Sequence, residues 1–204
     1  MKALITRKIG MTSVISEDGS IQPITMLLVD NNVLIGHRTL EIDGYSAAII
    51  GAGNSKKLSK PVLGIVKASK ATPAIIKEIR LTKPEENELN VGDQLTTDVF
   101  NIGDLVSVTG TSKGKGWAGT IKRHNFHRGR KTHGGGSYRR VGSIGSMYPQ
   151  HILKGKKMAG RMGHEQVTTR GLRVAHIDQA NNIIGVVGSV PGPRKGLVLI
   201  KGSK

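Results

Sequence analysis

The sequence contains no cysteine and very few aromatic residues. Without cysteine, the chain has no disulfide bond and no thiolate metal ligand, which fits a reducing compartment or indifference to redox conditions. Aromatic residues make up 3% of the 204 residues, so a core must consist mainly of Ile, Val, Leu and Ala. No window approaches the roughly 18 uninterrupted apolar residues of a membrane-spanning helix. The opening MKALITRKIGMTSVI lacks the long apolar stretch of a signal peptide, so neither feature is expected.

Acidic residues are also scarce. The chain has 14 Asp and Glu against 31 Lys and Arg, a formal net charge of +17 and a pI near 10.4. This charge predicts a polyanionic partner, either nucleic acid or an anionic membrane surface. A hydrophobic content of 37% is enough for a real core, so the chain is not disordered throughout. The length suggests one domain or two small ones.

The positive charge is concentrated in one segment. Residues 111–173 contain 15 Lys or Arg and one acid, Glu165, together with 13 of the 28 glycines and five of the seven histidines. The rest of the chain is nearly balanced, with a net charge of +3. This distribution indicates a globular protein that is interrupted by an intensely basic, glycine-rich segment.

The parts on either side of the basic segment have the pattern of β-strands. Short apolar stretches such as ITMLLV, DLVSVTG, LRVAHI and GLVLIKG alternate with turn signals, and DQANN at Asp178 predicts a hairpin turn. Helices are expected only at 60–69 and 116–124. Many short strands with few helices predict a mainly β fold that forms a closed or nearly closed barrel. Expected strands at 104–109 and 167–177 make the basic segment an excursion from the barrel rather than a tail.

Three interpretations of the basic segment differ in what balances its charge. Self-repulsion, glycine and scarce apolar groups oppose independent folding, so the segment is either a disordered basic linker or an arm that a polyanion orders. In such an arm, Lys and Arg contact phosphates, glycine permits close backbone approach, and aromatic and His side chains stack on unpaired bases. A membrane-surface helix needs a bulky apolar face, which the glycine spacing opposes. The nucleic-acid arm is preferred because long irregular loops are usually functional.

Patterns typical of enzymes are weak in this chain. Gly114, Gly116 and Gly119 match a dinucleotide-binding spacing, but the acid expected about 20 residues later for the ribose is absent until Glu165. The Glu85–Glu86 pair is best explained as part of a solvated turn. No Ser-His-Asp arrangement is indicated by spacing.

One group of histidines has to be weighed as a metal site. His124, His127 and His133 lie close together in the sequence and, in principle, could bind zinc without cysteine or carboxylate ligands. Because so many cations surround them, contact with RNA or simple exposure is the better explanation. No metal site is therefore predicted.

Several longer motifs together resemble one known family. GTSKGKGWAG is followed by KRHNF, THGGG, GSIG and KGKKMAGRMG, and from ITRKIGMTSV to VPGPRKGLVLIKG the chain is similar to the large-subunit ribosomal protein three (L-three) family of bacterial type. The resemblance implies a non-enzymatic structural protein of the cytoplasmic ribosome, with a six-stranded Greek-key barrel of the translation-protein type. Its implied partners are large-subunit rRNA and neighbouring ribosomal proteins, without a cofactor, membrane or small-molecule substrate. Early subunit assembly and the architecture around the peptidyl transferase centre are the implied roles.

The expected domain boundaries follow from the charge and the resemblance. Residues 1–110 form the first part of the barrel, with a small irregular or helical insertion near 53–80, and residues 166–204 supply the closing strands. Residues 111–165 form an rRNA-threading extension. Within it, the uncharged VGSIGSMYPQHIL at 141–153 lies between cationic stretches, which predicts a finger with basic sides and a neutral tip.

The candidate rRNA-binding residues all lie in this extension and act in two ways. The expected phosphate contacts are Lys113, Lys115, Lys122, Arg123, Arg128, Arg130, Lys131, Arg139, Arg140, Lys154, Lys156, Lys157 and Arg161. The expected stacking residues are Trp117, His124, His133 and Tyr148, with Met147 beside Tyr148 at the tip. No catalytic residue is expected.

Overall fold

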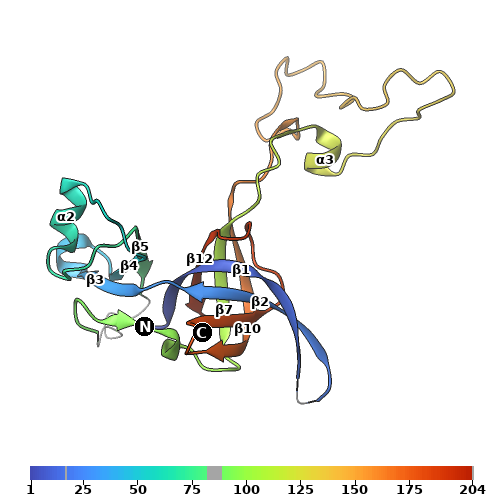
Figure 1. Ribbon diagram of the computed structural model, residues 1–204. Coiled ribbons are helices and arrows are strands. Elements are labelled where there is room, and N and C mark those ends of the chain that lie inside the picture. Colours follow the sequence, from blue (N-terminus) through green and yellow to red (C-terminus); the bar gives the residue numbers. More distant parts are fainter. Residues whose placement is uncertain (17, 82–88, 204) are drawn as a thin grey trace. The chain divides into compact units, whose positions relative to one another are not determined.

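The computed structural model describes residues 1–16, 18–81 and 89–203, and it divides into two compact units (Figure 1). The first unit, which we call the body, comprises Met1–Ser112 and Gln166–Lys204. The second, which we call the extension, comprises Lys113–Glu165. The Glu85–Glu86 pair lies outside the described residues.

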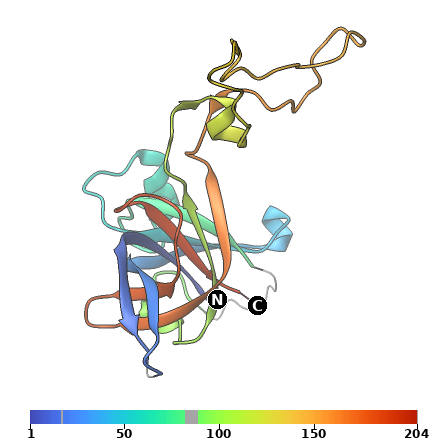
Figure 2. The same ribbon diagram turned by 90° about the vertical axis from the view of Figure 1, so that its right-hand side faces the viewer.

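Six antiparallel strands of the body close into a barrel because each strand pairs with two others, in the order β1-β12-β7-β10-β11-β2. Figures 1 and 2 show these strands wrapped around a common interior. The mainly β prediction is confirmed. The strands are β1 (Ala3–Ile15), β2 (Ile21–Val29), β7 (Leu105–Thr111), β10 (Gln166–Asp178), β11 (Ile183–Val187) and β12 (Leu197–Gly202).

Alternation of apolar and polar residues places one face of each strand in the barrel core. In β7, Val106, Val108 and Gly110 are buried while the residues between them are less covered, as a strand with one solvated face requires. Gly110 has no room for a side chain, because a Cβ there would lie 2.9 Å from the carbonyl oxygen of Pro191. The core is aliphatic, as its composition predicted, with Phe100 as the largest fully buried side chain.

A second sheet of four antiparallel strands lies in the same unit, in the order β5-β4-β3-β6. Its buried residues, which include Leu34, Ile50 and Ile79, join the barrel residues in one continuous hydrophobic cluster. The body is therefore a single packing unit. The remaining elements of the body are β3 (Asn32–Arg38), α1 (Leu40–Asp43), β4 (Ala47–Ala52), α2 (Lys60–Val66), β5 (Ile75–Arg80), β6 (Gln94–Leu95) and the 3-10 turn η2 (Thr97–Val99).

The insertion expected near 53–80 is only partly irregular or helical. The helix α2 begins at Lys60 with Pro61 in its first turn, as predicted, but it ends at Val66. The prediction of an irregular or helical segment is wrong for the last part of the insertion, because β5 pairs with β4 along its whole length. Its strand character was hidden because Ile79 is its one buried residue and charged residues surround it. Pairing with a neighbour thus decided a conformation that local composition left open.

Two local predictions have different outcomes. The hairpin turn at Asp178 is confirmed: β10 ends there, and the Asn181 N–H donates to the Asp178 carboxylate over 3.1 Å. The helix expected at 116–124 is confirmed only at its end, since α3 spans Thr120–His124 and Trp117 belongs to a short strand. Among the residues that the structure describes, no helix has both the length and the apolar character to cross a membrane.

Candidate nucleic-acid interface

The base of the extension is a short antiparallel ladder between its outgoing and returning segments. The strand β8 (Trp117–Ala118) pairs with β9 (Gly160–Arg161). The Lys115 N–H donates to the Met162 carbonyl and the Met162 N–H to the Gly116 carbonyl, both over 2.9 Å. Ala118, Thr120 and Gly160 are buried there. Because the residues at the base are small, the two segments approach closely enough to form backbone hydrogen bonds.

Helix α3 ties the returning segment to the outgoing one through two of the predicted site residues. Arg123 Nη1 donates to the Met158 carbonyl over 2.9 Å, and a ring nitrogen of His124 lies 3.0 Å from the same oxygen. A Cβ at position 160 would lie 2.5 Å from Arg123 Nη1, so a larger residue there would shift the guanidinium from its present position. Arg123 and His124 thus have partners within the extension itself, which makes them positioning residues for its base.

Beyond the base, the chain has no core of its own. From 125 to 157, every residue is described and none is buried. The loop 128–138 is closed by the Gly129 N–H, which donates to the Tyr138 carbonyl over 2.9 Å. Arg128 donates to the Tyr138 hydroxyl over 3.1 Å and lies 5.9 Å from its ring centroid. The order in this part comes from turns and a few surface contacts rather than from apolar burial.

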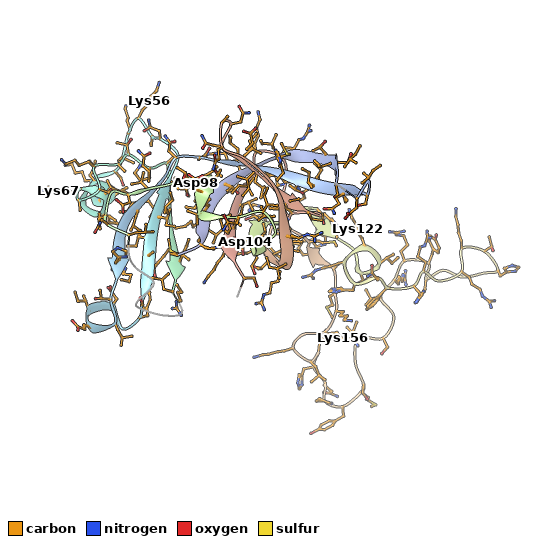
Figure 3. The ribbon with its side chains drawn as sticks, turned by 90° about the horizontal axis from the view of Figure 1, so that it is seen from below. Lys56, Lys67, Asp98, Asp104, Lys122 and Lys156 are labelled. Carbon is orange, nitrogen blue, oxygen red and sulfur yellow. The ribbon has the colours of Figure 1, made fainter. Side chains whose placement is uncertain are left out.

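The remaining predicted phosphate contacts are all exposed. The extension contains 13 Lys and Arg and a single acid, Glu165, so its own carboxylates can balance little of this charge. Lys122 lies on α3 and Lys156 on the returning segment, and Figure 3 labels both. The exposed cations are Lys113, Lys115, Lys122, Arg128, Arg130, Lys131, Arg139, Arg140, Lys154, Lys156, Lys157 and Arg161. The extension therefore presents this positive charge to solvent, with only one carboxylate of its own to balance it.

Four of the predicted stacking residues present their side chains to solvent. Trp117 is 80% exposed, Met147 88% and Tyr148 87%, although residues of these types are usually at least half covered in folded proteins. His133 is also exposed and has a positive φ of 59°. The structure therefore leaves these flat or flexible apolar groups free to meet a base, whereas His124 is engaged at the base of the extension.

The geometry does not support the two small-ligand alternatives. The Gly114, Gly116 and Gly119 pattern lies in an extended segment that leads through β8 into a five-residue helix, without the strand–helix–strand unit of a dinucleotide site. No group of three His, Cys, Asp or Glu residues that could hold a metal ion is found in the described part of the chain.

A second cationic surface lies on the body and was missed from the sequence. Residues 44–77 contain six lysines and no acid, a signal that the far stronger charge of the extension concealed. Lys56 and Lys67 both project from the part of the body that carries α2 (Figure 3). All six are exposed, and none pairs with a carboxylate that the structure describes: Lys56, Lys57, Lys60, Lys67, Lys70 and Lys77. We call this set the α2 lysine surface.

Comparison with known proteins identifies the family of this chain. The family model described as Ribosomal protein L3 matches residues 75–182. Proteins named large ribosomal subunit protein uL3 are similar over nearly the full chain. The one from Phytoplasma australiense is 47% identical over 98% of this chain and 92% of its own length. Those from Heliobacterium modesticaldum and Syntrophus aciditrophicus are each 45% identical, over 99% of this chain and 97% and 94% of their own lengths. The chain belongs to the ribosomal protein L3 family.

Proposed function

We propose that this protein binds large-subunit rRNA through its extension and thereby helps to build the large ribosomal subunit. Membership of the family makes it a structural, non-enzymatic component of that subunit, located with the ribosome in the cytoplasm. The observation that carries the rRNA-binding proposal is the twelve exposed cations on a segment with one acid and no buried residue between 125 and 157. Such a segment lacks both a core and a countercharge, and RNA supplies the second.

The mechanism is neutralisation of phosphates combined with threading between RNA helices. Each Lys or Arg that reaches a phosphate releases condensed counterions, so log affinity falls in proportion to log salt. Glycines such as Gly134 and Gly142, which have positive φ, let the backbone turn in ways that follow an irregular RNA surface. The ladder between β8 and β9 fixes the two segments side by side, so that cations on both can meet one RNA structure.

The body supplies the platform on which this binding depends. We assign its closed six-stranded sheet to the Greek-key barrel of the translation-protein type, as the motifs SKGKG and KGKKMAG imply by resemblance. Its α2 lysine surface provides further phosphate contacts, because its lysines are exposed and the segment 44–77 that carries them contains no acid. Contacts of the body with neighbouring ribosomal proteins complete its role in early subunit assembly.

The neutral tip of the extension has a different role from the basic segments on either side of it. Residues 141–153 carry no Lys, Arg, Asp or Glu, so they contribute little to counterion release. Met147 and Tyr148 are exposed there and offer an apolar, stackable surface. By resemblance to the family, this surface lies near the peptidyl transferase centre. We expect Met147→Ala with Tyr148→Ala to leave occupancy in purified subunits normal, but to change chemical probing of nearby RNA and the rate of peptide-bond formation. Unchanged probing and rates would make the tip a passive spacer.

The test of rRNA binding is the salt dependence of affinity. If six to ten cations meet phosphates, the slope of log affinity against log salt is on the order of −4 to −9. Lys156→Ala with Lys157→Ala should flatten that slope by roughly one to two units. The matched control is Lys2→Ala with Lys201→Ala, which removes the same charge from side chains that bond to Asp104 and to the Arg80 carbonyl in the body. Equal flattening by both pairs would mean that only net charge matters.

Two rival functions give different results in simple assays. A nucleotide-dependent enzyme that uses the glycine pattern at 114–119 would bind mononucleotides, which we expect this protein not to do. A free RNA chaperone would not remain in stoichiometric amounts with large subunits. Stoichiometric co-sedimentation through a high-salt cushion is the result expected for a structural component.

A further inference from the structure

The outer end of the hairpin formed by β1 and β2 extends beyond the rest of the barrel ladder. β1 pairs with β12 only over Ala3–Arg7, and β2 pairs with β11 only over Ile24–Leu28. The two strands nevertheless pair with each other as far as Ile15 and Ile21, as the blue strands of Figure 1 show. Residues 10–15 and 21–23 therefore form a two-stranded ribbon, which we call the distal ribbon.

One face of the distal ribbon is apolar and faces solvent. In the antiparallel register, Ile15 lies opposite Ile21 and Ser13 opposite Pro23, so these side chains share a face with Met11. Met11 is 50% exposed, Ile15 72% and Ile21 70%. The opposite face includes Ile24, which is fully buried in the body. The exposed face is thus mainly apolar, with Ser13 as its one polar side chain between Met11 and Ile15.

This ribbon also belongs to one of the two longest stretches of the chain without Lys or Arg, the other being 84–112. Residues 9–37 contain no Lys or Arg, although the chain has 31 of them. Its exposed charge is acidic, from Asp18 at the turn. Phosphate binding depends on Lys and Arg, so this surface is unsuited to RNA, in contrast to the extension and the α2 lysine surface.

The backbone of the ribbon presents an open edge. Beyond Arg7, the side of β1 that faces away from β2 pairs with no other strand among the described residues. Proteins usually protect such an edge with a lysine, a proline or a covering segment, because it can pair with another chain. The edge from 10 to 15 carries neither lysine nor proline. Near the barrel this edge is covered, because the Lys8 N–H donates to the Gly196 carbonyl and the Arg194 side chain lies beside Gly10. From Met11 to Ile15, no described strand pairs with it.

We propose that the distal ribbon is the docking surface for a neighbouring protein of the same ribonucleoprotein particle. The partner covers Met11, Ile15 and Ile21 with apolar side chains and adds an extended segment along the open edge of β1. It is a basic protein, because it shares the particle with RNA, and its cationic rim complements Asp18 at the turn of the ribbon. This inference rests on the proposed role in the large subunit.

The first experiment replaces Ile15 with a photo-crosslinking amino acid in the full chain and irradiates purified large subunits. We expect an adduct that survives ribonuclease and contains a peptide of a basic ribosomal protein. A ribonuclease-sensitive adduct, or none at full occupancy, would overturn the proposal. An adduct between two copies of this chain would show self-association instead. The same amino acid at Trp117, in the extension, should give an RNA adduct; its failure would count against rRNA binding without affecting the result at Ile15.

The second experiment tests the apolar face by charge. Ile15→Lys with Ile21→Lys should reduce the amount of the crosslinked neighbour that remains on subunits after a salt wash by about tenfold, while the free protein keeps its thermal unfolding midpoint. The matched control is Thr12→Lys with Gln22→Lys, which adds the same charge to the other face of the ribbon. Retention of the neighbour in both variants would contradict docking on this face.

Discussion

The body and the extension of this protein differ in what stabilises an ordered conformation. The body buries Leu4, Ile5, Leu27 and many other aliphatic side chains completely, and its charges are nearly balanced in the sequence. The extension buries little beyond Ala118, Thr120 and Gly160 at its base, and carries 13 cations against one acid. Apolar burial stabilises the body by itself, whereas the charge of the extension opposes compaction until an anion neutralises it. The body is therefore stabilised by its own core, whereas we propose that the extension becomes ordered when it binds RNA.

The largest expected difference between the two units is in amide hydrogen exchange of the free protein. Amides of β7 and β12 should exchange at least about a thousandfold more slowly than in an unfolded chain, because they open only with the core. Amides from 125 to 157 should exchange within about tenfold of the unfolded rate, because no residue there is buried. Added large-subunit rRNA should slow the second group. Strong protection of residues 125–157 without RNA would contradict the difference in stability between the body and the extension.

Matched leucine substitutions in the body and in the extension test the same difference in stability. Leu27→Ala in the body should lower the free energy of unfolding by about 2–5 kcal/mol, because it leaves a cavity beside a fully buried position. Leu153→Ala in the extension should change it by less than about 0.5 kcal/mol, since that side chain is 67% exposed. Urea unfolding followed by circular dichroism measures both. Similar losses would mean that the extension shares the stability of the body.

The smallest expected effect concerns an ion pair of the body. Lys2 Nζ, at 2.7 Å, and the Asn101 N–H hold the pKa of Asp104 below its usual value. A lowered folded pKa gives stability that is present above the unfolded pKa of about 3.9 and is lost as the pH falls through the folded pKa. Because the pair is exposed, Asp104→Asn should cost about 0.5 kcal/mol at neutral pH and nothing at lower pH.

Thermal unfolding between pH 2 and pH 7 measures this loss. The control is Glu41→Gln, which removes an exposed carboxylate of α1 and should change the unfolding midpoint little at any pH. A constant difference between Asp104→Asn and wild type across the whole range would show that the carboxylate acts through its shape rather than its charge. No comparable acid effect is expected from the extension, which has a single acid.

Much of this protein was predictable because periodicity and charge are local properties of a sequence. Alternating apolar residues predicted β7 and β12, and the cation count of the segment beginning near Lys113 predicted an exposed basic arm. The α2 lysine surface could also have been found, from the absence of acids between Asp43 and Glu78. Its six lysines are a weaker signal than the 13 Lys and Arg of the extension.

Other features depended on contacts between residues far apart in the chain. The sequence alone determined that the core is aliphatic, that the chain is mainly β, and that one segment has charge without a core, since composition and period settle each of these. Only the tertiary structure decided that β5 is a strand, because its pairing with β4 outweighs its charged surroundings. It also decided that Arg123 and His124 hold Met158, 34 or more residues away, and that no described strand pairs with the outer edge of β1 from 11 to 15. Local patterns determine which interactions a residue can make, and long-range packing determines which partner it makes them with.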